Sequence, residues 1–189
     1  MDAVSYLKQY KERSLKTIEL IPEEQVEELI LQLKTARERD KQVFICGNGG
    51  SASTASHLAN DLGKGASLKG KKRFRVISLT DNIPWMTALA NDLDYGQVFV
   101  EQLKNYAEPG DVLIAISGSG NSKNVLEAVS WANEHGLMTI GMTGRPGGDL
   151  GKLAKSVLFV ESSHMGQIED GHFLAQHMIG YYFMEADNA

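Results

Sequence analysis

The chain has 189 residues, of which 42% are hydrophobic and 23% are charged, and its formal net charge at pH 7 is −5. This length and apolar content suit one globular domain, residues 1–189, that buries a single core without crosslinks. The acidic balance argues against broad binding of nucleic acids or anionic membranes, although it leaves room for one local anion pocket.

The cysteine content and the first residues bear on the compartment. Cys46 is the single cysteine, so an internal disulfide is excluded, which fits a reducing compartment. The amino terminus lacks the basic start and apolar stretch of a secretory signal, and no apolar run approaches the ~20 residues of a membrane span. We therefore expect a cytoplasmic protein in which Cys46 packs as a small apolar side chain at a strand end.

The apolar positions change period along the chain. On either side of Pro22 they recur at helical spacing, which predicts two amphipathic helices within residues 1–40. After Lys41, short apolar runs alternate with helix-like segments. The runs predict strands near residues 42–46, 74–79, 111–116, 137–142 and 157–160. The other segments predict helices near residues 52–62, 84–90, 95–107, 123–135 and 167–185.

This alternation predicts an α/β fold with a doubly wound, mainly parallel five-stranded sheet that is covered by helices on both faces. In such sheets ligands bind beyond the carboxyl ends of the strands. Two loops rich in glycine and serine follow predicted strands at that edge: residues 47–51 (Gly-Asn-Gly-Gly-Ser) and residues 117–122 (Ser-Gly-Ser-Gly-Asn-Ser).

The first loop has the composition of an anion site. Gly49 and Gly50 let the backbone approach a ligand, Asn48 supplies a short donor, and Ser51 suits the N-cap of the helix predicted next. Two other interpretations stay open. A tight strand-to-helix turn would use the same glycines, and the loop also matches the dinucleotide pattern G-x-G-x-x-A. That pattern expects an acidic residue ~20 positions further on, where this chain has Lys69-Gly70-Lys71-Lys72.

The second loop offers three hydroxyls, on Ser117, Ser119 and Ser122, directly before a predicted helix. Hydroxyl donors at a helix amino end suit a phosphate monoester, although a serine-rich turn that caps its own helix would have the same composition. The basic run 69–75 is interpreted as a solvated approach to the next strand and is assigned no function.

Histidines and carboxylates gather on two of the predicted helices. His57 and Asp61 are four residues apart and share one face. The last helix places four titratable residues among apolar ones: Glu169, Asp170, His172 and His177. Buried polar groups need partners. Two interpretations stay open, a hydrogen-bonded network between helices and a site for a divalent transition metal such as zinc.

Taken together, these motifs resemble the SIS (sugar isomerase) domain of the phosphoheptose isomerase type. The resemblance covers nearly the whole chain, and it rests on residues 47–62, 91–92, 117–125, 143–148 and 167–177. It implies a flavodoxin-like fold and the interconversion of sedoheptulose 7-phosphate and D-glycero-D-manno-heptose 7-phosphate, which supplies heptose for lipopolysaccharide or capsule. It also implies a homotetramer with active sites at subunit contacts, in which residues 1–40 serve oligomer packing.

The same resemblance implies roles for individual residues. The substrate-binding positions are Asn48, Gly49, Gly50, Ser51, Asn91, Asp92, Ser117, Ser119 and Ser122. The ligands of a divalent metal, expected to be zinc, are His57, Asp61, Glu169 and His177. The catalytic base is placed at Asp61 and the acid at His177. Asp170 and His172 are expected to have hydrogen-bonded structural roles, His135 to be a helix C-terminal cation, and His164 to lie in a loop near the site.

The chain departs from the family pattern at two of these positions. The base position usually carries Glu and here is Asp61, and the position of Glu169 usually carries Gln. Aspartate is shorter by one methylene, about 1.5 Å, so its helix must lie closer to the substrate. Glu169 could itself be the base, and its added negative charge would tighten a divalent metal and, if unpaired, repel a substrate phosphate.

A second hypothesis from another class is a non-catalytic SIS module that binds a phosphosugar or a protein partner, such as a replication initiator. The chain retains two histidines and two carboxylates at the pertinent positions, which favours the enzyme.

Overall fold

The five predicted strands form one parallel sheet in the computed structural model, which describes residues 1–68 and 70–187. The strands are β1 (Gln42–Gly47), β2 (Arg75–Ser78), β3 (Val112–Ile116), β4 (Met138–Gly144) and β5 (Ser156–Val160). Their order in the sheet is β2-β1-β3-β4-β5. This is the flavodoxin-like order, and it confirms the predicted doubly wound α/β fold.

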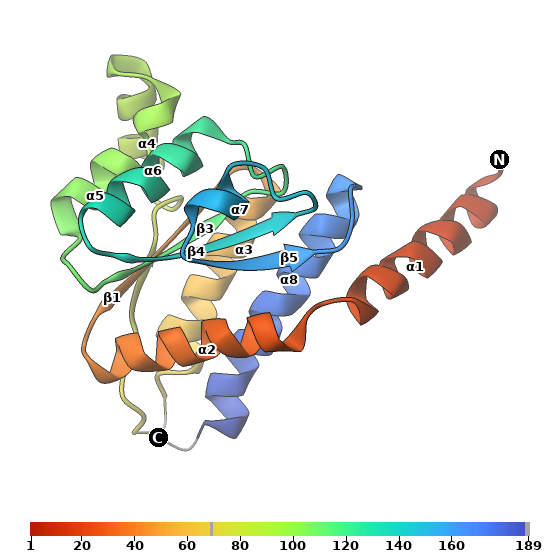
Figure 1. The fold of residues 1–189 in the computed structure, drawn as a ribbon, viewed down its shortest axis with the longest axis horizontal. Helices are drawn as coiled ribbons and strands as arrows, with labels where there is room; N and C mark the ends of the chain where they lie inside the picture. The colour runs from red at the N-terminus through yellow and green to blue at the C-terminus, as the bar shows by residue number, and fades with distance from the viewer. Residues whose placement is uncertain (69, 188–189) are drawn as a thin grey trace.

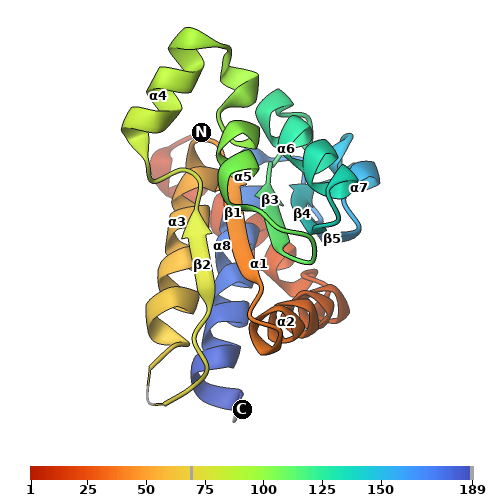
Figure 2. The ribbon, with the colours of Figure 1, turned by 90° about the vertical axis from the view of Figure 1, so that its left-hand side faces the viewer.

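Helices cover both faces of the sheet (Figures 1 and 2). One face packs against α2 (Glu23–Glu38), α3 (Gly50–Asn60) and α8 (Met165–Tyr181). The other packs against α5 (Val100–Tyr106), α6 (Lys123–Glu134) and α7 (Leu150–Leu153). Successive strand residues point to opposite faces of the sheet. Ile45 therefore packs in the core beneath α2, α3 and α8, while Phe44 and Cys46 pack in the core beneath α5, α6 and α7. Burial raises the pKa of the Cys46 thiol to about 12, so the predicted apolar packing of this residue is confirmed.

The two predicted leading helices are α1 (Ala3–Glu19) and α2. In Figure 1, α1 extends away from the rest of the fold, and Thr17 is its one buried residue. The Tyr10 hydroxyl of α1 donates a hydrogen bond of 3.1 Å to the Asp170 carboxylate on α8. Among the residues that the structure describes, none of the helices has both the length and the apolar content that a membrane crossing requires.

The start of α3 corrects one prediction. The helix begins at Gly50, and its N-cap is Gly49, whose φ is +56°. Glycine reaches this left-handed conformation without strain, so the loop ends two residues earlier than predicted. The expectation that Ser51 caps the helix is therefore wrong, because Ser51 lies in the first turn and is buried. Beyond Asn60 the helix continues as η1, a π-helical segment (Asp61–Gly65).

Several helices have other bounds than predicted. The segment 95–107 is divided into a 3-10 turn, η2 (Tyr95–Gln97), and α5, because the Asp94 carboxylate caps a separate turn by accepting from the Gly96 amide. The four residues of α7 are too few to show a period in the sequence. Helix α8 begins at Met165 and continues as the π-helical segment η3 (Tyr182–Ala186), and the predicted helix near 84–90 is α4 (Ile83–Asp92).

The basic run before β2 also differs from prediction, because Lys71 is not simply solvated. Its Nζ donates to the backbone carbonyls of Phe183 at 2.6 Å and Asp187 at 2.7 Å, so it binds the end of the described chain. Lys69, where the run begins, lies outside the described residues.

A buried ion pair fixes the same end of the chain. Arg37 on α2 donates to the Asp187 carboxylate, and Lys34 lies 3.3 Å from its other oxygen. The Arg37 guanidinium also lies 5.1 and 5.2 Å from the ring centres of Phe74 and Phe183.

Candidate active site

The two glycine–serine loops lie side by side, because they follow the neighbouring strands β1 and β3. Strand β1 pairs with β2 on one side and with β3 on the other, so the loops meet at the topological switch point, where ligands bind in sheets of this kind. They enclose a pocket of about 300 Å³. Seven predicted substrate-binding residues line it: Asn48, Gly49, Gly50, Ser51, Ser117, Ser119 and Ser122.

The pocket suits an anion. It lies at the amino ends of α3 and α6, whose N-caps are Gly49 and Ser122, and no side chain of the described residues caps either helix. Each helix amino end is equivalent to roughly half a positive charge. The hydroxyls of Ser117 and Ser122 lie 3.0 Å apart on one wall, where one donates to the other and the second O–H remains to donate to a ligand. Backbone dipoles and hydroxyls together suit a phosphate monoester.

Asn48 is held by two side chains to which sequence reasoning assigned no role. Its amide pairs head to head with the amide of Asn124, through hydrogen bonds of 2.8 and 2.9 Å. The Tyr95 hydroxyl donates to the same Asn48 oxygen at 2.9 Å. Asn124 belongs to the motif that carries the family resemblance and could have been found there. Tyr95 is distant in sequence and gives no local signal.

Asn91 and Asp92 do not line this pocket. They lie at the carboxyl end of α4, both are exposed, and the Asn91 amide donates to the Asp92 carboxylate at 2.8 Å. Within this chain the structure therefore brings the two loops together but leaves these two predicted residues apart from them.

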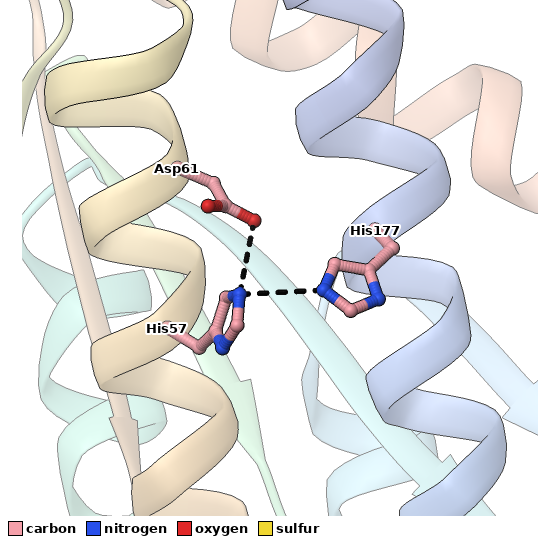
Figure 3. A group of neighbouring side chains, drawn as sticks. All are labelled: His57, Asp61 and His177. Atoms are coloured by element: carbon pink, nitrogen blue, oxygen red, sulfur yellow. Dashed lines mark hydrogen bonds and ion pairs between the residues drawn. The ribbon is translucent and has the colours of Figure 1, made fainter.

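A second cluster lies where α3 and η1 face α8: His57, Asp61 and His177, called here the His–Asp–His group (Figure 3). The His57 Nε2 atom is 3.4 Å from an Asp61 oxygen and 3.3 Å from the His177 Nε2 atom. Asp61 is the first residue of η1, so the α3 pattern changes to π-helical at the carboxylate that faces the histidines. The Phe173 ring packs edge-on against both imidazoles. The predicted proximity of His57, Asp61 and His177 is thus present in the structure.

The chemistry of this group fits a divalent cation. One His57 nitrogen faces two neighbours, and since it carries at most one proton, a hydrogen bond can satisfy only one contact. The Asp61 oxygen nearest to it is buried and lacks a hydrogen bond within residues 1–68 and 70–187. A tetrahedral zinc ion with ligands at 2.0–2.1 Å would place neighbouring donor atoms about 3.3 Å apart, which matches both spacings. Imidazole and carboxylate are also ligands that zinc accepts.

Glu169, the fourth predicted ligand, does not belong to the group. It lies eight residues before His177 on α8, a rise of about 12 Å, and its carboxylate points into the loop pocket. Its carboxyl atoms lie 2.7 Å from where a Cβ atom on Gly50 would stand. Only a glycine at position 50 leaves room for this placement.

The other titratable residues of α8 and the remaining histidines lie outside both sites. Asp170 accepts the hydrogen bond from Tyr10, as a structural role predicts. His172 is buried, and burial lowers its pKa to about 4, so the ring is neutral at physiological pH. Neither of its ring nitrogens has a hydrogen bond within residues 1–68 and 70–187, so the expected hydrogen-bonded role is not present there. His135 ends α6 with its ring stacked on Trp131, and His164 is the exposed N-cap of α8.

Gly180 sets how closely α8 approaches Asp61. A Cβ atom at position 180 would lie 3.1 Å from the Asp61 Cβ and 3.3 Å from its carboxylate oxygen. The absence of a side chain at position 180 therefore lets α8 pack directly against Asp61.

Known proteins resemble this chain in sequence and in fold. The family model of the SIS domain matches residues 5–144. A probable phosphoheptose isomerase from Thermoplasma acidophilum is 40% identical over 148 residues, which are 78% of this chain and 81% of that protein. A phosphoheptose isomerase from Helicobacter pylori is 38% identical over 170 residues, which are 90% of this chain and 88% of that protein.

Solved structures agree with these matches. The structure of a phosphoheptose isomerase from Neisseria gonorrhoeae superposes with a TM-score of 0.86 at 30% identity, over 95% of this chain and 96% of that one. That of a phosphoheptose isomerase from Francisella tularensis superposes with a TM-score of 0.88 at 26% identity, over 99% of this chain and 100% of that one.

Proposed function

Because this chain belongs to the phosphoheptose isomerases of the SIS domain family, we propose that it interconverts sedoheptulose 7-phosphate and D-glycero-D-manno-heptose 7-phosphate. It is an aldose–ketose isomerase. The observation that carries the proposal is the convergence of His57, Asp61 and His177 from two helices. A binding module needs no such group of proton-transfer side chains, and the second hypothesis has no support among the relatives described above.

The loop pocket binds the phosphate end of the sugar through Ser117, Ser119, Ser122 and the amino ends of α3 and α6. Asn48, held by Asn124 and Tyr95, orients the first loop. Asn91 and Asp92 retain their implied role toward substrate, and the exposed placement of α4 suits a contribution to the site of a neighbouring subunit.

The reaction moves a carbonyl between C1 and C2 and needs a base, an acid and stabilisation of an enediolate oxygen. Asp61 or Glu169 takes the proton from the carbon next to the carbonyl, and His177 returns a proton. A divalent metal, which we propose is zinc, would be held by His57, Asp61 and His177 with Glu169 as a further ligand, and would lower the cost of charge on the enediolate.

The apolar side chains on α1, among them Val4, Leu7 and Leu15, are exposed, and we propose that they pack against other copies of the chain in a homotetramer. The enzyme acts in the cytoplasm, and its product enters heptose synthesis for lipopolysaccharide or capsule.

A coupled assay against a panel of ketose and aldose phosphates, with and without chelator, tests this function. We expect conversion of sedoheptulose 7-phosphate, loss of that conversion with chelator, and recovery on adding Zn²⁺, because the enediolate charge is then stabilised again. A rate unaffected by chelator would contradict the metal. Phosphosugar binding without turnover of any member of the panel would replace the enzyme by the binding module.

Substitution of Gly180 tests the close approach of α8. Gly180→Ala adds a methyl group 3.1 Å from the Asp61 Cβ, so the carboxylate or the helix must shift by a few tenths of an ångström. We expect turnover to fall by at least about tenfold, since small displacements of catalytic groups cost up to about 100-fold. The matched control is Gly151→Ala, whose added methyl would lie 3.1 Å from Phe159 and would meet no residue of the His–Asp–His group. Equal turnover of the two variants would show that α8 need not lie so close.

A further inference from the structure

Glu169 occupies the pocket that the proposed function assigns to a phosphate. The residues lining this pocket include no lysine or arginine, and Glu169 is the one ionisable side chain among them in the described chain. Its carboxylate lies against Gly50, the first residue of α3. A carboxylate therefore stands at the helix end where an anion would be held.

The charges of the pocket nearly cancel while Glu169 is there. The amino ends of α3 and α6 together contribute roughly one positive charge. The ionised carboxylate contributes one negative charge, so an incoming phosphate gains little from the helix ends and is repelled by Glu169. With the side chain elsewhere, the pocket is positive and the space over Gly50 is free.

The His–Asp–His group lies on the same side of α8 as Glu169. Glu169, Phe173 and His177 follow one another at intervals of four residues, so their side chains project from successive turns. The Phe173 ring contacts both imidazoles of the His–Asp–His group, with ring centres 5.0 and 4.8 Å away. That group has three donors, and zinc prefers four.

We propose that Glu169 couples the two sites: without a divalent cation its carboxylate excludes phosphate monoesters from the loop pocket, and a cation at the His–Asp–His group draws it away. This inference rests on the proposed function, which defines both sites. Coupling of this kind is reciprocal, so the cation raises phosphate affinity by the same factor by which phosphate raises cation affinity.

Calorimetry with glycerol 3-phosphate tests the coupling, because this compound has the phosphate monoester but no carbonyl to isomerise. Three proteins are titrated, each metal-free and each with Zn²⁺: the unaltered chain, Glu169→Gln and Asp170→Asn. The last is the matched control, since it removes the same charge from the next residue, which faces Tyr10 and not the pocket.

We expect metal-free Glu169→Gln to bind glycerol 3-phosphate at least about tenfold more tightly than the metal-free unaltered chain, within the usual range of coupling. Zn²⁺ should tighten binding by a similar factor in the unaltered chain and in Asp170→Asn, and by less than about threefold in Glu169→Gln. A competition titration with a zinc-binding dye should give the reciprocal factor.

Equal metal-free affinities of the unaltered chain and Glu169→Gln would overturn the coupling. The coupling would also be overturned if metal-free Asp170→Asn gained as much affinity for glycerol 3-phosphate as metal-free Glu169→Gln, because the effect would then be one of overall charge. If none of the three proteins bound glycerol 3-phosphate even with Zn²⁺, the phosphate pocket of the proposed function would be wrong instead.

Discussion

Replacing His177 with alanine is expected to lower the turnover of sedoheptulose 7-phosphate by at least about 100-fold, the lower end of what a general acid–base group contributes. The imidazole is the one titratable group that α8 places beside His57, with 3.3 Å between the two Nε2 atoms. It is half-buried at the surface between helices, so its loss leaves the cores intact. Steady-state kinetics with a thermal unfolding curve separates lost chemistry from lost folding.

Asp61→Asn should have a similar effect, because it preserves shape and removes the negative charge. His135→Ala is the matched control, since His135 ends α6 at the opposite end from the loop pocket. Near-normal turnover in both His177→Ala and Asp61→Asn would refute the assignment of base and acid.

Replacing Arg37 with methionine is expected to lower the free energy of unfolding by about 3 kcal/mol, because it leaves the Asp187 carboxylate buried with a weaker partner. Both side chains of this pair are 1% exposed. Lys34 remains 3.3 Å from the carboxylate, which keeps the loss at the lower end for a broken buried pair. Urea denaturation measures the change.

Two matched variants isolate the pair. Arg37→Met combined with Asp187→Leu should recover most of the loss, because no buried charge is then left alone. Lys34→Met removes the partly exposed partner and should cost less than about 1 kcal/mol. A loss for Arg37→Met no larger than that for Lys34→Met would show that the buried pair contributes nothing special.

The same pair gives stability a pH dependence of known sign. Burial alone would raise the pKa of the Asp187 carboxyl, but Arg37 and Lys34 outweigh burial and lower it below its ordinary value of 3.8. When the pKa of a carboxyl is lower in the folded than in the unfolded state, the carboxylate stabilises the fold at pH values above the unfolded-state pKa. This stabilisation is lost as the pH falls through the folded-state pKa. Arg37→Met should therefore flatten the stability profile below about pH 4.

The central strands β1 and β3 could be predicted because burial on both faces of the sheet requires a short continuous apolar run in each of them. Element ends were less accessible. The start of α3 depends on the left-handed backbone of Gly49. The five residues of η1 are too few to show a hydrophobic period in the sequence. Lys71 was misjudged because its carbonyl partners, such as that of Phe183, come from the far end of the chain.

The candidate site divides in the same way. The composition of the two loops and the spacing of His57 and Asp61 indicated an anion pocket and a metal group before any geometry was known. Neither the role of Tyr95 nor the position of the Glu169 carboxylate over Gly50 could be inferred, because both depend on how distant segments pack.

By itself, the sequence determined the alternation of strands and helices, the chemistry of the loops and the family, since these are encoded in local periods and residue types. Tertiary structure alone decided which charges meet. It placed the Glu169 carboxylate over Gly50 and the Asp61 carboxylate against Gly180, because helix packing brings together groups that are more than a hundred residues apart in the chain.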